Sequence, residues 1–149
     1  MAVYLDSSAL VKLVVAEPES EALRRFLKRR PDRVTSALAH VEVLRAVRAQ
    51  GESAMKRALR VLARVRLLRI DDGVLEAAAS LDPCVLRSLD AIHIASAREL
   101  GSDLEILVTY DRRMSEASLM LGMSVRAPGT VGDRERSRPR RSRPRPIKP

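Results

Sequence analysis

Ile106-Leu-Val-Thr-Tyr-Asp111 is a short apolar run that ends on an acid, and it decides the fold class of this chain. Because no polar residues alternate along it, the run predicts a buried strand over about residues 105–109. Ala2-Val-Tyr-Leu-Asp6 has the same form and predicts a second buried strand that also ends on an acid. Strands of this kind are typical of parallel sheets that are covered by helices.

Helical and extended segments alternate along the rest of the chain. Three further strands are predicted, at residues 33–36, 66–70 and 123–126. One helix is predicted to begin at Ser53, and the others cover residues 8–15, 18–30, 39–50, 73–81, 89–100 and 112–121. Ser88 is expected to cap the helix that follows it. The alternation predicts an α/β fold, a three-layer α/β/α sandwich with a mostly parallel central sheet.

The basic charge of the chain is concentrated near its end. The net charge is +9, from 28 basic and 19 acidic residues. Residues 134–149 hold eight of the basic residues and one of the acids, which leaves residues 1–133 close to neutral. We therefore expect a folded domain over residues 1–128 and a disordered basic tail, rich in Arg, Pro and Ser, over residues 129–149.

Composition excludes several classes of protein. The chain has two Tyr, one Phe and no Trp, so a sheet that stacks RNA bases on aromatic rings is not expected. Contacts with nucleic acid would instead run from Lys and Arg to phosphates. The single cysteine rules out an intramolecular disulfide, which fits a reducing compartment. Since no apolar run approaches the ~20 residues that span a bilayer, we expect a soluble cytoplasmic protein.

Four acids lie at the edges of apolar runs, namely Asp6, Glu42, Asp90 and Asp111. A carboxylate directed toward a core is costly unless it is paired, hydrogen-bonded or bound to a metal ion. Asp6 and Asp111 follow predicted strands, and ligands of open α/β sheets bind at the carboxyl ends of strands. The four acids therefore predict a pocket for a hard divalent cation, Mg²⁺ or Mn²⁺. Such an ion positions water and stabilises charge on a phosphodiester during hydrolysis.

Each of these acids also has a simpler explanation. Asp6 and Asp111 both precede predicted helices, which they are suited to cap. Asp90 lies in a first helical turn, where the helix dipole favours negative charge. Glu42 is placed to pair with Arg45 one turn later. The sequence leaves these alternatives open.

Other charged residues allow two interpretations. His93 lies three residues after Asp90, so it is either a metal ligand or general base, or a residue packed beside the pocket. The Arg-rich helices between residues 24 and 69 form either an RNA-facing surface or a solvated one. Arg112 and Arg113 are better candidates for RNA contact, because they follow a predicted site acid directly. As a whole, the chain is either an enzyme or a non-catalytic RNA- or protein-binding module.

Four segments of the chain follow one another in this order: Leu5-Asp-Ser-Ser-Ala-Leu-Val-Lys12, Val41-Glu-Val-Leu-Arg-Ala46, Leu89-Asp-Ala-Ile-His-Ile-Ala95 and Val108-Thr-Tyr-Asp-Arg-Arg-Met114. Together they resemble the four motifs of PIN-domain ribonucleases. More narrowly, they resemble the VapC-type toxins of type II toxin–antitoxin systems. The resemblance extends over about residues 1–128 and does not include the basic tail.

The resemblance implies an α/β/α sandwich that cuts RNA as a metal-dependent endoribonuclease, with Mg²⁺ or Mn²⁺ held by the acidic residues. Asp6 and Asp90 would be the core metal ligands, Glu42 and Asp111 would complete the pocket, and Thr109 would add a supporting hydroxyl. A homodimer and a VapB-type antitoxin are also implied. The apolar predicted helix near the N-terminus is a candidate surface for that partner.

Overall fold

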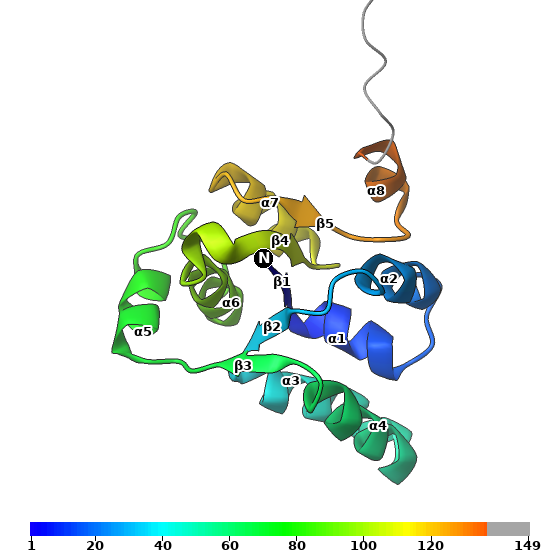
Figure 1. The fold of residues 1–149 in the computed structure, drawn as a ribbon. Coiled ribbons are helices and arrows are strands. Elements are labelled where there is room, and N and C mark those ends of the chain that lie inside the picture. Colours follow the sequence, from blue (N-terminus) through cyan, green and yellow to red (C-terminus); the bar gives the residue numbers. More distant parts are fainter. Residues whose placement is uncertain (137–149) are drawn as a thin grey trace, which may run out of the picture.

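The computed structural model describes the backbone of residues 1–136 and the side chains of residues 1–133. Its centre is a five-stranded parallel sheet with the strand order β3-β2-β1-β4-β5 (Figure 1). The strands are β1 (Ala2–Leu5), β2 (Arg33–Ser36), β3 (Arg66–Leu68), β4 (Leu104–Val108) and β5 (Val125–Arg126). The two strands that the sequence marks most clearly, β1 and β4, are neighbours in this sheet.

Helices cover both faces of the sheet. On one face lie α1 (Ser7–Val14), α2 (Ser20–Leu27), α3 (Leu38–Val47) and α4 (Glu52–Leu62). On the other lie α5 (Asp72–Ala79), α6 (Ser88–Arg98) and α7 (Arg112–Met120), and a short helix, α8 (Val131–Arg136), follows β5. The predicted α/β/α sandwich with a parallel sheet is confirmed. None of the described helices is both long and apolar enough to span a membrane.

The strand β1 and the second half of β4 are apolar because each of their faces meets a separate core. In β1, Val3 and Leu5 pack against α1 to α4, whereas Tyr4 packs against α6 and α7. In β4, Val108 belongs to the first core and Leu107 to the second. All five side chains are fully buried. Successive residues of a strand point to opposite faces, so a strand covered on both sides can be apolar at every position, as β1 is.

One of the two helix starts that the sequence suggests is present and the other is not. Asp6 caps α1 by accepting a hydrogen bond from the backbone N–H of Ala9 (2.9 Å). The prediction that Ser88 caps α6 is wrong, since Ser88 is the first helical residue and Arg87 is the N-cap. Arg87 makes no side-chain cap bond, so the first turn of α6, which contains Asp90, begins without a side-chain cap.

The fold continues a little past the predicted end of the folded domain. Asp133 of α8 is 8% exposed and pairs with Arg126 of β5 at 2.5 Å. Gly129 has a φ of +96° and approaches α2 so closely that an added Cβ would lie 2.9 Å from the Cβ of Ala22. The start of the predicted tail is therefore attached to the domain, and residues 137–149 lie outside the described residues.

Gly129→Ala is expected to loosen the attachment of α8, because the new methyl group would collide with α2 at a backbone position that favours glycine. We expect a local loss on the order of 1–3 kcal/mol, which would speed amide hydrogen exchange in residues 130–133 about tenfold or more. Gly132→Ala is the matched control, since nothing lies within 4 Å of its added Cβ. Equal exchange rates in the two variants would contradict the close approach.

Candidate active site

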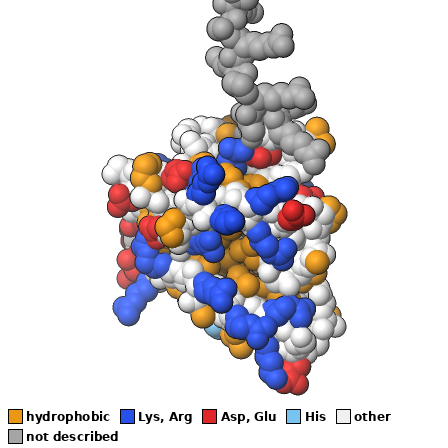
Figure 2. Space-filling view, turned by 45° about the vertical axis from the view of Figure 1, so that its right-hand side comes forward, with side chains coloured by type: hydrophobic (Ala, Val, Ile, Leu, Met, Phe, Trp, Pro, Cys, Tyr) orange, Lys and Arg blue, Asp and Glu red, His pale blue; other side chains and the backbone are white. Residues whose placement is uncertain are grey.

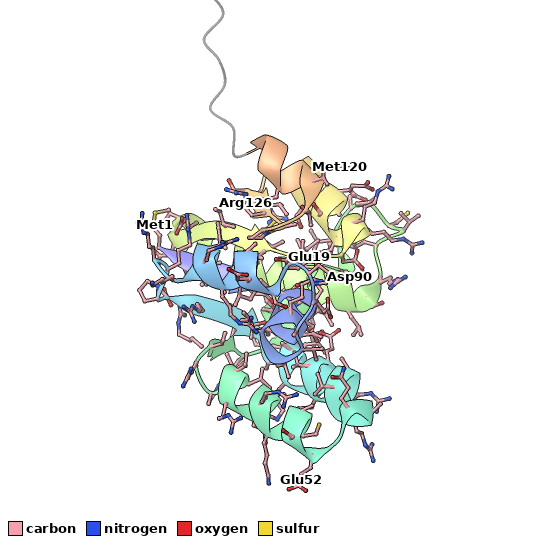
Figure 3. The ribbon with its side chains drawn as sticks, turned by 90° about the vertical axis from the view of Figure 1, so that its right-hand side faces the viewer. Met1, Glu19, Glu52, Asp90, Met120 and Arg126 are labelled. Carbon is pink, nitrogen blue, oxygen red and sulfur yellow. The ribbon has the colours of Figure 1, made fainter. Side chains whose placement is uncertain are left out.

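The four acids predicted to form a pocket lie toward the carboxyl edge of the sheet. Asp6 follows β1 directly, and Asp111 precedes α7 just beyond the end of β4. Glu42 lies in α3 and Asp90 in the first turn of α6, so each helical layer supplies one acid. Figure 3 shows Asp90 near the middle of the molecule. The acids therefore come from four separate elements that the parallel sheet brings together.

Asp6 is the most enclosed of the four acids, with 4% of its surface exposed. Its Oδ1 accepts hydrogen bonds from the backbone N–H of Ala9 (2.9 Å) and the hydroxyl of Ser8 (2.7 Å). Its Oδ2 accepts a hydrogen bond from the hydroxyl of Thr109 (2.6 Å). Burial raises the pKa of Asp6 above its usual value, and these hydrogen bonds offset that effect only in part. The ionised form would gain from a nearby cation.

Thr109 connects Asp6 to Asp111. Its hydroxyl donates to Asp6 Oδ2 and accepts a hydrogen bond from the backbone N–H of Asp111 (3.0 Å). Asp111 in turn caps α7, because its Oδ1 accepts from the backbone N–H of Met114 (3.0 Å). The capping roles that the sequence left open are therefore present at both acids. They orient the two carboxylates and are compatible with a further role at the site.

Asp90 has a buried carboxylate oxygen without a partner. Among the described residues, none makes a hydrogen bond to its Oδ2. Burial raises the pKa of Asp90, the negative charges of Asp111 and Asp6 raise it further, and Arg87 and His93 oppose the rise. Asp90 therefore lies within electrostatic reach of two other site acids. A buried carboxylate oxygen in such a position calls for a ligand.

Glu42 is held by side chains from two other helices. Its Oε2 accepts hydrogen bonds from the hydroxyl of Ser7 and from Nε2 of His93 (2.6 Å). Burial acts to raise the pKa of Glu42, but these hydrogen bonds outweigh it and lower the pKa. Among the described residues, Glu42 is hydrogen-bonded to His93 and makes no ion pair with Arg45. His93 is thus a member of the site, and its spacing from Asp90 was the one signal in the sequence.

These acids suit a divalent cation in their chemistry, although they are not already assembled around one. All four are carboxylates, the oxygen ligands that Mg²⁺ and Mn²⁺ favour, and Asp90 offers an unused buried oxygen. Within residues 1–133, no three His, Cys, Asp or Glu side chains are positioned to hold one ion. Binding would require carboxylates to turn toward a shared ion, which would relieve the repulsion among them.

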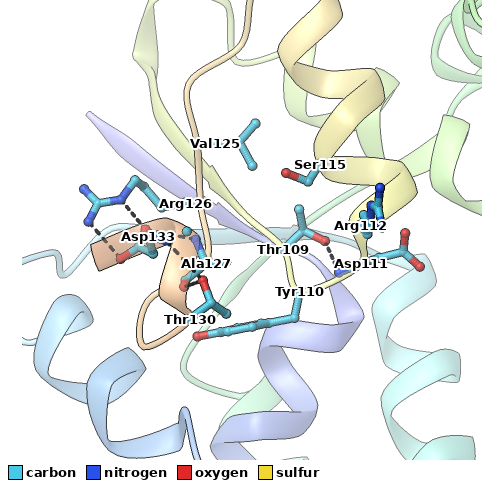
Figure 4. A pocket seen from close by; sticks show the side chains of 11 residues that line it. Thr109, Tyr110, Asp111, Arg112, Ser115, Val125, Arg126, Ala127, Thr130 and Asp133 are labelled. Carbon is cyan, nitrogen blue, oxygen red and sulfur yellow. Dashed lines mark hydrogen bonds and ion pairs between the residues drawn. The ribbon is translucent and has the colours of Figure 1, made fainter. Parts of the chain in front are cut away.

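Tyr110 separates two cavities beside the acids. A cavity of about 370 Å³ lies on the side of Glu42, a second of about 160 Å³ lies on the side of Asp111 (Figure 4), and Tyr110 lines both. The backbone N–H of Tyr110 donates to Ser8 Oγ (2.9 Å), and its hydroxyl donates to the carbonyl of Pro128 (2.8 Å). The smaller cavity is also lined by α8, so the segment after β5 shapes the space next to Asp111.

This fold, with acids at the carboxyl edge of its sheet, matches a known protein family. The model of the PIN domain family matches residues 3–119, from β1 into α7, and the match includes all four acids. The chain belongs to the PIN-domain family. Its predicted resemblance to PIN-domain ribonucleases of the VapC type is confirmed by the relatives described next.

Two ribonucleases of Mycobacterium tuberculosis are similar to this PIN domain. Ribonuclease VapC46 is 58% identical over 127 residues, which cover 85% of this chain and 98% of the relative. Ribonuclease VapC35 is 45% identical over 131 residues, which cover 85% of this chain and 97% of the relative. A solved toxin–antitoxin complex from Klebsiella pneumoniae has the same fold, with a TM-score of 0.60, 21% identity, and coverage of 73% of this chain and 86% of that chain.

The effect of Mn²⁺ on the stability of this PIN domain is expected to depend on pH through Asp6 and Asp90. Both have a raised pKa when folded, so their protonated forms favour the folded state. That contribution is complete below the unfolded pKa of about 4 and is lost as the pH rises through the folded pKa. Mn²⁺ competes with these protons, so the rise in Tm on adding Mn²⁺ should grow as the pH rises above the unfolded pKa, which a comparison of a mildly acidic pH with neutral pH detects.

Differential scanning calorimetry with EDTA or Mn²⁺ at each pH measures this effect. At a free Mn²⁺ concentration of 100 times Kd, the expected stabilisation near neutral pH is about 2.7 kcal/mol. A variant that carries both Asp6→Asn and Asp90→Asn is the control, and its Tm should not respond to Mn²⁺ at either pH. A rise in the wild-type Tm that is the same at both pH values would contradict the prediction.

Proposed function

We propose that this PIN domain is a divalent-metal-dependent endoribonuclease and the toxin of a VapC-type toxin–antitoxin pair. The observation that carries the proposal is the buried Oδ2 of Asp90, which has no hydrogen-bond partner among the described residues. The negative charges of Asp111 and Asp6 lie near enough to raise the pKa of this carboxyl group. An acidic cluster with a purely structural role would be expected to satisfy its buried oxygens. The names of the two relatives, matched over nearly their full length, support the same function.

Each acid has a proposed part in this reaction. Asp6 and Asp90 would hold the ion, while Glu42 and Asp111 would complete its coordination or orient the attacking water. Mg²⁺ is the proposed working ion, and Mn²⁺ fits the same oxygen ligands. When bound, the ion lowers the pKa of its water and stabilises the charge that develops on the phosphodiester. Thr109 supports the site by keeping Asp6 and Asp111 in fixed relation.

RNA would approach this site through its phosphates. Lys and Arg side chains are spread over the face of the molecule shown in Figure 2, which favours a polyanion. Arg112 and Arg113 are both exposed directly after Asp111. Arg112 pairs with Glu116 of the same helix, but both side chains are solvent-exposed and the pair is weak. A phosphate can therefore replace Glu116 beside the acids at little cost.

The proposed partner is a VapB-type antitoxin, and the proposed assembly is a homodimer of this chain. The cavity of about 370 Å³ beside Glu42 is lined in part by Val11 and Lys12 of α1, the apolar helix predicted to face a partner. An antitoxin segment could enter there and place an Arg or Lys among the carboxylates, where it would compete with the cation. RNA and antitoxin would both meet the toxin in the cytoplasm.

The nuclease proposal is tested by RNA cleavage with the purified, antitoxin-free protein. Total RNA incubated with Mg²⁺ or Mn²⁺ should be cut at a limited set of sites, and EDTA should prevent cutting. Sequencing of the new ends then identifies the target RNA and the sequence at the cut. A folded protein that cuts no RNA with any divalent cation would contradict the proposal.

A non-catalytic RNA- or protein-binding module with the PIN fold is the second candidate. One observation favours it. Within residues 1–133, no three His, Cys, Asp or Glu side chains are close enough together to hold one metal ion. This candidate predicts that Mn²⁺ leaves the Tm unchanged at neutral pH. The nuclease requires an increase, because a ligand that binds only the folded state must raise the Tm.

A further inference from the structure

His93 of α6 lies enclosed between Tyr4 of β1 and Glu42 of α3. The hydroxyl of Tyr4 is 2.8 Å from Nδ1 of His93, and Oε2 of Glu42 is 2.6 Å from Nε2. Only 2% of His93 is exposed, and Tyr4 is fully buried. The ring of His93, on one face of the sheet, therefore connects β1 to α3, which lies on the other face. It is out of reach of solvent and of any large substrate.

The hydrogen-bond pattern assigns the proton on this ring. The backbone N–H of Ser36 donates to the Tyr4 hydroxyl oxygen (3.0 Å), and the hydroxyl can donate its own proton to Nδ1 of His93. The carboxylate of Glu42 only accepts hydrogen bonds, so the proton of the neutral ring lies on Nε2 and is directed at Glu42, and Nδ1 is the acceptor. The opposite tautomer would place two acceptors, Nε2 and a carboxylate oxygen, at 2.6 Å.

This arrangement fixes one oxygen of Glu42 and leaves the other available. Oε2 accepts from both His93 and the hydroxyl of Ser7, whereas Oε1 makes no hydrogen bond within residues 1–133. Glu42 and Ser7 both line the cavity of about 370 Å³ beside the acids. The carboxylate is therefore held by its inner oxygen, with Oε1 free to bind an ion or a water molecule.

We propose that His93, oriented by Tyr4, is a positioning residue that keeps the carboxylate of Glu42 in a fixed position relative to Asp90. This inference rests on the proposed nuclease function. His93 lies one turn after Asp90, so the two share a face of α6. The helix that carries Asp90 thus also holds the acid of α3. His93 acts through Glu42 and does not contact RNA, because it is buried.

Substitution of His93 tests this role. His93→Leu should lower both kcat for RNA cleavage and the affinity for Mn²⁺ by roughly 10- to 100-fold, the usual effect of losing a hydrogen-bond partner of a metal-site carboxylate. KM for RNA should stay within about twofold, because a buried side chain contributes nothing to RNA binding. His93→Gln should restore most of both quantities, since its amide N–H can reach Glu42. His40→Leu is the matched control, because His40 is the other histidine and is exposed on α3.

Nitrogen-15 NMR of the imidazole reads the tautomer without any need for RNA. In a His40→Gln background, where His93 is the single histidine, the spectrum should show a protonated Nε2 and an unprotonated Nδ1. Tyr4→Phe should produce a mixture of tautomers and a smaller loss of Mn²⁺ affinity than His93→Leu. A wild-type spectrum with the proton on Nδ1 would overturn the proposal.

The remaining outcomes separate this proposal from the proposed function. Wild-type Mn²⁺ affinity and kcat in His93→Leu would overturn the positioning role while the nuclease stands. Mn²⁺ binding that falls in His93→Leu, in a protein that cuts no RNA, would support the positioning role and count against the nuclease. If His93→Leu does not fold, Tyr4→Phe decides, and wild-type Mn²⁺ affinity in Tyr4→Phe would overturn the proposal.

Discussion

Asp6→Asn is expected to lower kcat for RNA cleavage by at least about a thousandfold and to leave the protein folded. The side-chain amide keeps an oxygen for the N–H of Ala9, so α1 stays capped, because Asn and Asp are similarly good N-caps. The substitution removes a charge that would hold the cation. A loss of about 4 kcal/mol of transition-state stabilisation corresponds to roughly a thousandfold in rate. Single-turnover cleavage of the mapped RNA at saturating Mg²⁺ measures the effect.

Asp71→Asn is the matched control for this experiment. Asp71 caps α5 in the same way, since its Oδ1 accepts from the backbone N–H of Val74 (3.0 Å), but it is exposed and lies outside the acidic site. Cleavage by Asp71→Asn should match that of the wild type. If the two variants lost activity equally, the loss at Asp6 would come from capping and the metal-site assignment would be wrong.

Asp90→Asn is expected to have opposite effects on activity and on stability. Cleavage should fall by about a thousandfold or more, because the variant loses a proposed core ligand of the ion. In EDTA near neutral pH, the Tm should rise, because the substitution removes a buried charge that Asp111 and Asp6 repel. We expect a net gain on the order of 1 kcal/mol, or about 3 °C, after the loss of a favourable helix-dipole interaction. Thermal unfolding with EDTA and with Mn²⁺ measures it.

Asp72→Asn separates the local effect from the effect of the site. Asp72 also lies in the first turn of its helix, α5, but it is exposed and has no other role. Its substitution should slightly lower the Tm, through the helix dipole alone, and leave cleavage unchanged. A lower Tm in Asp90→Asn together with full cleavage would show that Asp90 is an ordinary acid of a first helical turn.

The central strands could be predicted to within one residue, whereas the edge strands could not. β1 and β4 are buried on both faces, so their apolar runs match their paired lengths. β3 and β5 are shorter than the predicted 66–70 and 123–126, because each pairs with one neighbour only and its length depends on how far that neighbour extends. The length of an edge strand is therefore determined by its pairing partner in the sheet and not by the residues next to it in the sequence.

The location of the four acids toward one edge of the sheet could also be predicted, but not the hydrogen bonds that hold them. A carboxylate at the end of an apolar run is conspicuous, and Asp6, Glu42, Asp90 and Asp111 all have that setting. The sequence could not show that Asp6 and Asp111 cap helices and also share the hydroxyl of Thr109. For the same reason, the sequence could offer only the nearby Arg45 as an alternative partner of Glu42 and could not show the hydrogen bond to His93.

By itself, the sequence determined the α/β class and the order of helices and strands up to β5, and it singled out the four acids. Those features are local, because burial on one or both faces appears directly as the spacing of apolar residues. Only the tertiary structure decided which polar groups meet. Tyr4 reaches His93 across 89 positions, and His93 reaches Glu42 across 51. Such contacts depend on how helices pack on the two faces of the sheet. The local spacing of apolar residues in the sequence does not predict them.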